Sequence, residues 1–238
     1  MEDKIQQFKQ LVNKCDNIVF FGGAGVSTES GIPDFRSKDG LYNQKYKYPP
    51  ETILSHTFFM NKTEEFFKFY KLKMNSLKYQ PNITHIKLAE LETKGKLKAV
   101  ITQNIDGLHQ KAGSKVVYEL HGSVLRNYCM NCHKFYDAEY VFNSNGIPRC
   151  SCGGIIKPDV VLYEEGLDEE TIENSIDAIQ KADLLIVAGT SLTVQPASGL
   201  INFFRGRNLV LINRDSTPYD NKANLVINDS LGKVFSNL

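Results

Sequence analysis

Four of the five cysteines lie in one short region, at a spacing that favours a metal site. They are Cys129, Cys132, Cys150 and Cys152. Cysteines paired on tight turns can place four thiolates around Zn²⁺, and Gly153-Gly154 would permit such a turn after the second pair. Because four thiolates leave no open position for water, we predict one structural zinc ion rather than a catalytic one. His133 is the alternative to one thiolate, and Cys15 fits a small buried hydrophobe on the first helix.

A glycine turn, Gly23-Ala24-Gly25-Val26-Ser27-Thr28, follows a short apolar run and precedes a predicted short helix. Glycines let a backbone approach a pyrophosphate closely, and a helix N-terminus supplies N–H donors and a favourable dipole. The full dinucleotide pattern requires a third small residue where Thr28 stands, and no clear acidic residue ends a second strand about 20 residues later. The turn by itself is therefore equally well explained as an ordinary connection between a strand and a helix.

Polar side chains follow two further apolar runs. Gln103 and Asn104 come directly after one run, with Asp106 close behind, and His121 follows another. A histidine in isolation is most often a satisfied core residue, but a position at a strand end before Gly122 favours function. Because an unperturbed imidazole has a pKa of about 6.5, His121 is suited to act as a general base.

Six short apolar runs, each ending in polar or glycine residues, predict the strands of a buried parallel sheet. They are Ile18–Phe21, Leu97–Ile101, Val116–Leu120, Leu184–Ala188, Leu209–Ile212 and Leu225–Ile227. Helical patterns lie between several of them, namely Ile5–Cys15, Ile83–Thr93 and Glu170–Ala182. This alternation predicts an α/β fold with a doubly wound sheet, in which ligands bind at the carboxyl ends of the strands. The unusual polar residues fall at those ends, which indicates a ligand site there.

Two stretches interrupt the alternation. Residues 38–81 hold no convincing strand and contain an aromatic helical segment, Thr63–Met74, whereas residues 126–157 hold the cysteines. We predict that the first forms a helical module and the second a zinc-binding module, which together make a smaller domain over the sheet edge. The main domain is then built from residues 1–37, 82–125 and 158–238.

The bulk properties exclude several classes of protein. The 238 residues carry a net charge of +1, and the sequence pI is about 7.6, so no strong field favours nucleic acid or an anionic membrane. Sparse basic residues around the cysteines argue against a zinc ribbon that binds nucleic acid. The chain lacks a long apolar span, and its start lacks the apolar core of a signal peptide. We therefore expect a soluble cytoplasmic protein.

Several motifs, in order along the chain, resemble those of the sirtuin family. The first spans Gly23–Arg36 and includes Gly31-Ile32-Pro33-Asp34-Phe35-Arg36; the second is Thr102-Gln103-Asn104-Ile105-Asp106-Gly107-Leu108-His109; the third is Glu119-Leu120-His121-Gly122-Ser123. The four cysteines, Gly189-Thr190-Ser191 and Asn213 follow in the family order. Two departures are Gly22, where the family usually has Thr, and the single residue between the last two cysteines.

The resemblance implies a Rossmann-like domain for NAD and a smaller domain made of a zinc-ribbon module and a helical module. It implies catalytic roles for His121 and Asn104. The residues that it assigns to NAD are Ala24, Thr28, Phe35, Arg36, Gln103, Ile105, Asp106, His121, Gly189, Thr190, Ser191 and Asn213. Those that it assigns to the acyl-lysine substrate are Tyr70 and a segment that would pair with the peptide backbone as a strand, Val160, Val161, Leu162 and Tyr163.

The implied activity is an NAD-dependent protein-lysine deacetylase, with an acetyl-lysine protein or peptide as partner. The acyl oxygen would displace nicotinamide from the ribose of NAD, a consumed co-substrate. His121 would then remove a proton from the ribose hydroxyls, and the acyl group would end on ADP-ribose. Two alternatives are an NAD-dependent dehydrogenase, which leaves the zinc site unexplained, and a mono-ADP-ribosyltransferase.

The helical module also bears on which acyl group is removed. Sirtuins that prefer succinyl-lysine or malonyl-lysine resemble one another in a Tyr-x-x-Arg motif, and here Tyr70 is followed by Lys73 in place of the Arg. An Arg offers a planar, two-pronged donor to a carboxylate, whereas Lys is a point charge on a flexible stem. We expect Lys73 to project to solvent and acetyl-lysine to be a better substrate than succinyl-lysine.

Overall fold

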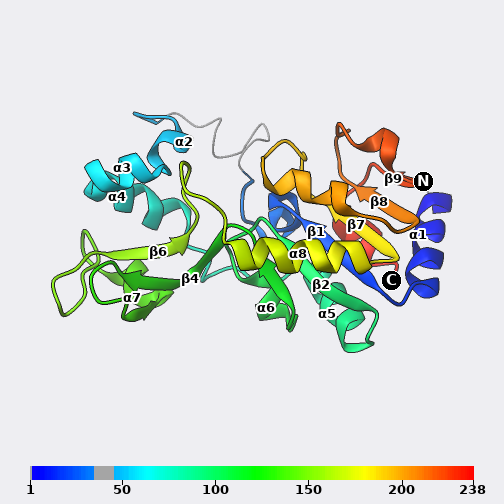
Figure 1. Ribbon diagram of the computed structural model, residues 1–238, viewed down its shortest axis with the longest axis horizontal. Coiled ribbons are helices and arrows are strands. Elements are labelled where there is room, and N and C mark those ends of the chain that lie inside the picture. The colour runs from blue at the N-terminus through cyan, green and yellow to red at the C-terminus, as the bar shows by residue number, and fades with distance from the viewer. Residues whose placement is uncertain (1, 35–45) are drawn as a thin grey trace.

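The computed structural model describes residues 2–34 and 46–238, which form a large sheet-centred unit and a smaller unit beside it (Figure 1). The large sheet has six strands in the order β3-β2-β1-β7-β8-β9. Their bounds are β1 Ile18–Gly22, β2 Leu97–Thr102, β3 Val117–Glu119, β7 Leu184–Ala188, β8 Asn208–Ile212 and β9 Leu225–Ile227. Every neighbouring pair is parallel. Each of the six apolar runs is thus a strand, and the order reverses between β1 and β7, as it does in dinucleotide-binding folds.

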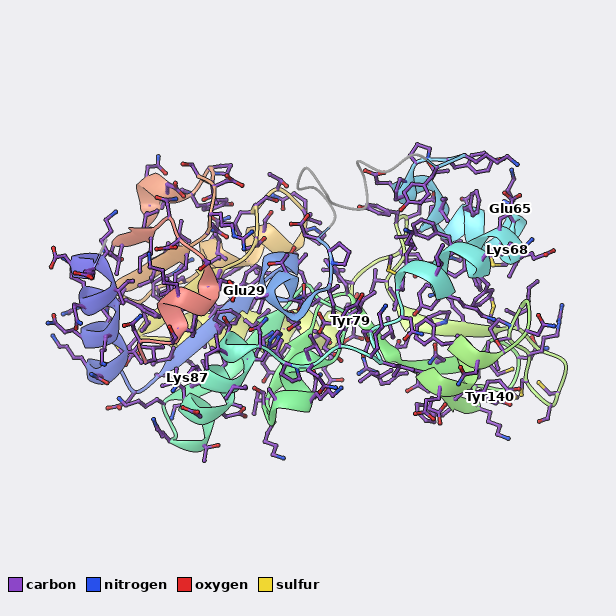
Figure 2. All side chains as sticks on the ribbon, turned by 180° about the vertical axis from the view of Figure 1, so that it is seen from behind. Glu29, Glu65, Lys68, Tyr79, Lys87 and Tyr140 are labelled. Atoms are coloured by element: carbon purple, nitrogen blue, oxygen red, sulfur yellow. The ribbon has the colours of Figure 1, made fainter. Side chains whose placement is uncertain are left out.

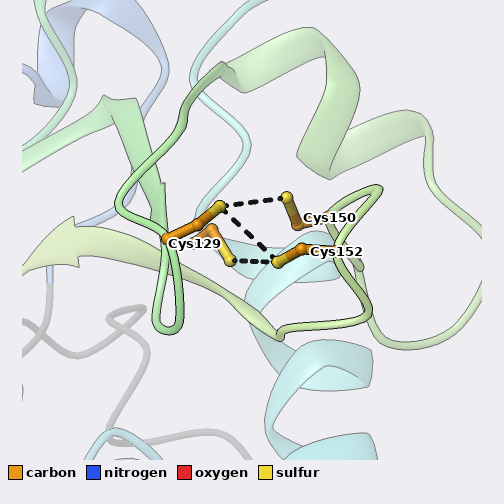
Figure 3. Close-up of side chains that lie close together, drawn as sticks. Cys129, Cys150 and Cys152 are labelled. Carbon is orange, nitrogen blue, oxygen red and sulfur yellow. Dashed lines mark hydrogen bonds between the residues drawn. The ribbon is translucent and has the colours of Figure 1, made fainter.

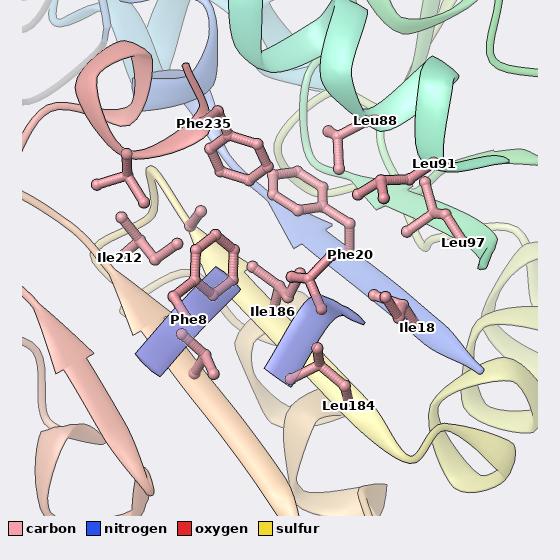
Figure 4. Close-up of a cluster of buried hydrophobic side chains, with 14 of the residues drawn as sticks. Phe8, Ile18, Phe20, Leu88, Leu91, Leu97, Leu184, Ile186, Ile212 and Phe235 are labelled. Atoms are coloured by element: carbon pink, nitrogen blue, oxygen red, sulfur yellow. The ribbon is translucent and has the colours of Figure 1, made fainter. Parts of the chain in front are cut away.

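The sheet is covered on both faces because successive side chains of a strand point to opposite sides. Ile18 and Phe20 of β1 face a core that also contains Phe8, Leu88 and Phe235 (Figure 4). Three helices contribute to this core and cover one face of the sheet: α1 Glu2–Lys14, α5 Ile83–Thr93 and α9 Leu231–Phe235.

The alternate residues of the same strand face a second core. Val19 and Phe21 pack with Leu185, Ile179 of α8 Glu169–Lys181 and Leu200 of the 3₁₀ helix η4 Ala197–Phe203. The fold is therefore the predicted doubly wound α/β sheet. A short helix, α6 Leu108–Ala112, and a 3₁₀ turn, η5 Asp220–Lys222, complete this unit.

The smaller unit combines helices and an antiparallel sheet of order β5-β4-β6. Its strands are β4 Gly122–Cys129, β5 Phe135–Asp137 and β6 Ile156–Val160, and its helices are α2 Pro50–Ile53, α3 His56–Asn61, α4 Thr63–Lys73 and α7 Ala138–Asn143. One apolar core holds both parts, because Phe66 and Phe67 of α4 share it with Val124, Cys129 and Ile156 of the sheet. The opposite face of α4 carries Glu65 and Lys68, which point outwards (Figure 2).

Both chain termini lie at the end of the molecule remote from the smaller unit (Figure 1). Within the described residues, none of the helices combines the length and the apolarity needed to cross a membrane.

Candidate active site

The glycine turn after β1 packs against the turn after β7, at the point where the strand order reverses. The Gly25 N–H donates to the carbonyl of Gly189 over 2.8 Å. A Cβ on Gly25 would lie 2.8 Å from the Gly189 Cα, and Gly189 itself has a φ of 61°. Only glycines allow this backbone contact, so the two turns form one floor at the carboxyl edge of the sheet.

The segment after the glycine turn differs from the short helix that we predicted. It consists of two 3₁₀ turns, η1 Ala24–Val26 and η2 Thr28–Ser30. The Ile32 N–H bonds back to the Ser27 carbonyl over 3.2 Å, which folds the chain instead of extending a helix. Because the aligned dipole of a longer helix is absent from this segment, the turn offers individual N–H groups to an anion instead.

One cleft of about 660 Å³ opens above these turns, between the two units. Tyr79, which lines it, lies at the junction of the units in Figure 2. Every predicted NAD or acyl-lysine residue that the structure describes also lines this cleft. They are Tyr70, Ala24, Thr28, Gln103, Asn104, Ile105, Asp106, His121, Val160, Val161, Leu162, Tyr163, Gly189, Thr190, Ser191 and Asn213. The remaining two, Phe35 and Arg36, lie outside the described residues.

A buried serine joins two of the predicted residues. The Ser27 hydroxyl donates to Asp106 Oδ2 over 2.6 Å and accepts from Asn104 Nδ2 over 3.1 Å. The second oxygen of Asp106 accepts from the Leu108 N–H over 2.9 Å. Burial raises the pKa of the Asp106 carboxyl, and the bonds from Ser27 and Leu108 offset this only in part.

Ser27 is a site residue that the sequence analysis missed. The residue is 1% exposed, and its hydroxyl fixes the orientation of both Asn104 and Asp106. The only indication in the sequence was its position inside the glycine turn, since its partners lie 77 and 79 residues away along the chain.

A second series of hydrogen bonds connects residues that follow β2, β7 and β8. Gln103 Nε2 donates to Thr190 Oγ1 over 3.1 Å, and the Thr190 N–H donates to Asn213 Oδ1 over 2.9 Å. The Asn213 side-chain nitrogen is buried without a hydrogen-bond partner among the described residues. A buried donor left in this state is costly, so it is available for a polar ligand.

His121 lies just beyond the end of β3, and one of its ring nitrogens is already bound. Nδ1 lies 2.8 Å from the backbone carbonyl of Gln103. A carbonyl can only accept, so the neutral ring carries its hydrogen on Nδ1 and its lone pair on Nε2. Burial lowers the pKa of His121, and the bond to Gln103 opposes that shift. A neutral imidazole with its lone pair on Nε2 is the form that a general base requires.

Hydrogen bonds to other parts of the chain hold the predicted peptide-binding segment. The Val161 N–H donates to the carbonyl of His121 over 3.0 Å, and the Tyr163 N–H donates to that of Leu54 over 3.0 Å. The Leu162 N–H donates to Glu165 Oε2 over 2.9 Å. The carbonyls of Val160, Leu162 and Tyr163 also accept bonds, from Lys157 Nζ, the Glu165 N–H and the His56 N–H, but each carbonyl oxygen keeps a second lone pair for a peptide strand.

The four predicted cysteines come together in the smaller unit (Figure 3). Their sulfur atoms all lie within 4.8 Å of one another, and the Cys129–Cys152 and Cys132–Cys150 pairs are each 3.5 Å apart. Four sulfurs bound to one Zn²⁺ at about 2.3 Å are roughly 3.8 Å apart, so the cluster matches a closed tetrahedral site. His133 has a φ of 57° and does not belong to this cluster.

Known proteins are similar to this chain in sequence and in architecture. The profile of the Sir2 family matches residues 23–196. The chain belongs to the Sir2 family. A relative from Clostridium perfringens (strain 13 / Type A), described as an NAD-dependent protein deacetylase, is 63% identical over 238 residues and 98% of each chain. The resemblance to sirtuins is thereby confirmed.

Solved Sir2 structures agree along almost the whole chain. A Sir2 variant with a deacetylated p53 peptide and 3′-O-acetyl ADP-ribose has a TM-score of 0.90 at 39% identity, covering 98% of this chain and 96% of that one. A Sir2 structure with a p53 peptide and NAD⁺ has a TM-score of 0.86 at 40% identity, covering 98% and 95%. The Rossmann-like sheet and the separate unit with a four-cysteine cluster are therefore the sirtuin fold.

The helical part of this Sir2 protein differs from our expectation at Lys73. This residue lines the cleft together with Tyr70 and does not simply project to solvent. Its Nζ lies 5.6 Å from the centre of the Tyr46 ring. Tyr70 is fully buried, stacks on Phe142 at 5.6 Å, and its hydroxyl has no hydrogen-bond partner among the described residues. α4 ends at Lys73, and the next two residues, Met74 and Asn75, also line the cleft.

Proposed function

We propose that this sirtuin is an NAD-dependent protein-lysine deacetylase that uses His121 as its general base. The observation that carries the proposal is the cleft itself, which is lined both by His121, whose Nδ1 is held by the Gln103 carbonyl, and by the paired glycine turns. Membership of the Sir2 family and the deacetylase description of a 63% identical relative support it. NAD supplies a ribose carbon that becomes electrophilic as nicotinamide leaves, and it is consumed.

The residues of the cleft fit NAD. The paired turns of Gly25 and Gly189 line the cleft where a pyrophosphate would lie, with Ala24 and Thr28 beside them, and the Asn213 nitrogen, which has no partner among the described residues, can donate to the adenosine half. Asp106 and Asn104, held by Ser27, would bind the nicotinamide amide and the adjoining ribose. Phe35 and Arg36 keep the roles that the family resemblance implies.

His121 would remove a proton from the ribose hydroxyls. Its Nδ1–H is held by the Gln103 carbonyl, so the proton can be accepted only at Nε2. Burial favours the neutral ring, which keeps the base ready at neutral pH. Asn104 would orient the ribose or an ordered water from the neighbouring wall.

The acetyl-lysine peptide would bind along Val160, Val161, Leu162 and Tyr163, with Tyr70 near its acyl end. The carbonyl oxygens of this segment would accept from the peptide N–H groups through their second lone pairs, whereas the N–H groups of Val161, Leu162 and Tyr163 each have one hydrogen, which is already bonded. We further propose a cytoplasmic location and no direct binding of nucleic acid, in line with the net charge of +1.

Mass spectrometry of the products from NAD and an acetyl-lysine peptide tests the proposal. We expect nicotinamide, free lysine peptide and O-acetyl-ADP-ribose in equal amounts. ADP-ribose attached to protein would instead identify a mono-ADP-ribosyltransferase. Reversible absorbance of reduced cofactor, without loss of nicotinamide, would identify a dehydrogenase.

A further inference from the structure

The chain passes from the large sheet to the small sheet at His121. β3 ends at Glu119, β4 begins at Gly122, and between them the backbone turns sharply, with a φ of 73° at Gly122. A Cβ on Gly122 would collide with the carbonyl of Asp159 on β6. His121 is therefore carried on a joint, and the angle of that joint sets where its ring lies in the cleft.

One side chain spans this joint. Arg126, on β4, donates from Nη1 to Glu119 Oε2 over 2.6 Å and from Nε to Asp159 Oδ2 over 2.7 Å. Glu119 lies two residues before His121, and Asp159 lies directly before Val160, where the predicted peptide segment starts. The Glu119 side chain is only 7% exposed, so its bond to Arg126 is shielded from solvent.

We propose that Arg126 is a positioning residue, which holds His121 and the peptide-binding segment in register with each other. The inference rests on the proposed function, because it takes His121 as the base and Val160–Tyr163 as the peptide segment. Arg126 does not line the cleft in which both substrates would bind. It acts by locking the end of β3 to β4 and β6, and so fixes the angle at which His121 enters the cleft.

The chemistry of the side chain explains why an arginine is needed. The planar guanidinium presents several N–H donors in a rigid fork, so Nε and Nη1 can bind two carboxylates in different directions at once. A lysine in the same place is a single flexible point charge and would hold one carboxylate well or both loosely. An isolated surface ion pair contributes little, but here both partners are fixed on separate strands of the joint.

The turns expected to bind NAD should not depend on the bonds that Arg126 makes to Glu119 and Asp159. They are the turns after β1 and β7, which bond to each other through Gly25 and Gly189. Loosening the joint should therefore displace His121 relative to a normally bound NAD. A displacement of about 1 Å in a catalytic group can lower the rate by roughly 100-fold.

The test compares Arg126→Met and Arg126→Lys with Arg205→Met, a matched control. Arg205 is exposed and, within the described part of the chain, bonds carbonyls near its own position, those of Asn202 and Phe204. We expect Arg126→Met to lower kcat for an acetyl-lysine peptide by about 10- to 100-fold, with an unchanged KM for NAD. Arg126→Lys should restore kcat in part, and Arg205→Met should match the wild type.

Two further variants test the two hydrogen bonds of Arg126 separately. Glu119→Gln should lower kcat, since it releases the bond beside His121. Asp159→Asn should act mainly on the KM for the peptide, since it releases the bond beside Val160. Binding of ADP-ribose, measured by calorimetry, should be the same in all variants.

The outcomes distinguish this inference from the function on which it rests. A wild type that does not turn over NAD with the peptide overturns the proposed function, and this inference with it. An active wild type whose Arg126→Met variant keeps its kcat overturns this inference alone. The same holds if Arg126→Met loses kcat, ADP-ribose affinity and thermal stability together, because that pattern marks a general structural role.

Discussion

At the scale of single residues, the decisive feature is the direction of the His121 ring. We expect His121→Ala to lower the rate of deacetylation by about 100- to 10,000-fold. The reason is that Nδ1 carries the hydrogen bonded to the Gln103 carbonyl, so Nε2 is the ring atom that can accept a proton. The fold and the binding of ADP-ribose should be unchanged. Steady-state assays with circular dichroism as the control check this, and a near wild-type rate would remove His121 from the mechanism.

The pH dependence of the wild type follows from the same histidine. Because burial lowers its pKa, the ring of the free enzyme stays neutral to a lower pH than an exposed histidine, whose pKa is about 6.5. Activity should be present above the lowered pKa and should fall as the pH drops through it. The acid limb of kcat/KM should therefore lie below pH 6.5, and a limb above that value would contradict the assignment.

Ser27 provides a second test at this scale. Replacing it with Ala leaves a buried carboxylate on Asp106 and the Asn104 amide without their shared partner. An unsatisfied buried polar group costs about 1–3 kcal/mol, so we expect the affinity for NAD to fall about tenfold. Titration calorimetry measures this. Ser236→Ala, at an exposed position outside the cleft whose hydroxyl donates to the Lys233 carbonyl, is the matched control.

Lys73 bears on acyl preference. We predict that acetyl-lysine is a better substrate than succinyl-lysine, because one flexible ammonium binds a carboxylate less well than a guanidinium does. Since Lys73 lines the cleft beside Tyr70, some activity on succinyl-lysine should remain, and Lys73→Met should lower it selectively. The measurement is kcat/KM for two versions of one peptide. A clear preference of the wild type for succinyl-lysine would show that the ammonium is a stronger carboxylate site than we assume.

At the scale of elements, the zinc site should stabilise the smaller unit. The apolar core of that unit includes Cys129 and Cys150, so loss of the metal would loosen the sheet and α4 together. We expect one zinc ion per chain by elemental analysis. Removal by a chelator should unfold this unit and lower activity, with the secondary structure of the large sheet retained. A metal-free protein with an unchanged melting curve and full activity would exclude the role.

At the scale of the whole molecule, the cleft joins two units that have separate cores. A ligand that binds only the folded cleft should stabilise the chain by about 2.7 kcal/mol at 100 times its Kd. For a chain of this size that corresponds to a rise in Tm of roughly 2–4 °C per kcal/mol. We therefore expect ADP-ribose to raise the Tm by several degrees. The Gly189→Ala variant, whose Cβ would lie 2.5 Å from the Val26 nitrogen, should show no such rise.

The sequence by itself determined the six strands of the large sheet, the four longest helices and the four clustered cysteines, but not the strands of the small sheet. These features depend on local patterns, since a strand buried on both faces requires a continuous apolar run such as Ile18–Phe21, and a zinc knuckle requires cysteines at short spacing. The motifs around His121 and the glycine turn likewise sufficed to assign the family, and with it the sirtuin fold.

Only the tertiary structure decided how the side chains of the site are held. Ser27 meets Asp106 across 79 residues of sequence, and Arg126 reaches Asp159 across 33. Such bonds depend on strand register and on the angle between two sheets, which no local pattern encodes. The same reason applies to the 3₁₀ turns after Gly23 and to the place of Lys73 in the cleft, because both are set by the parts of the fold that pack against them.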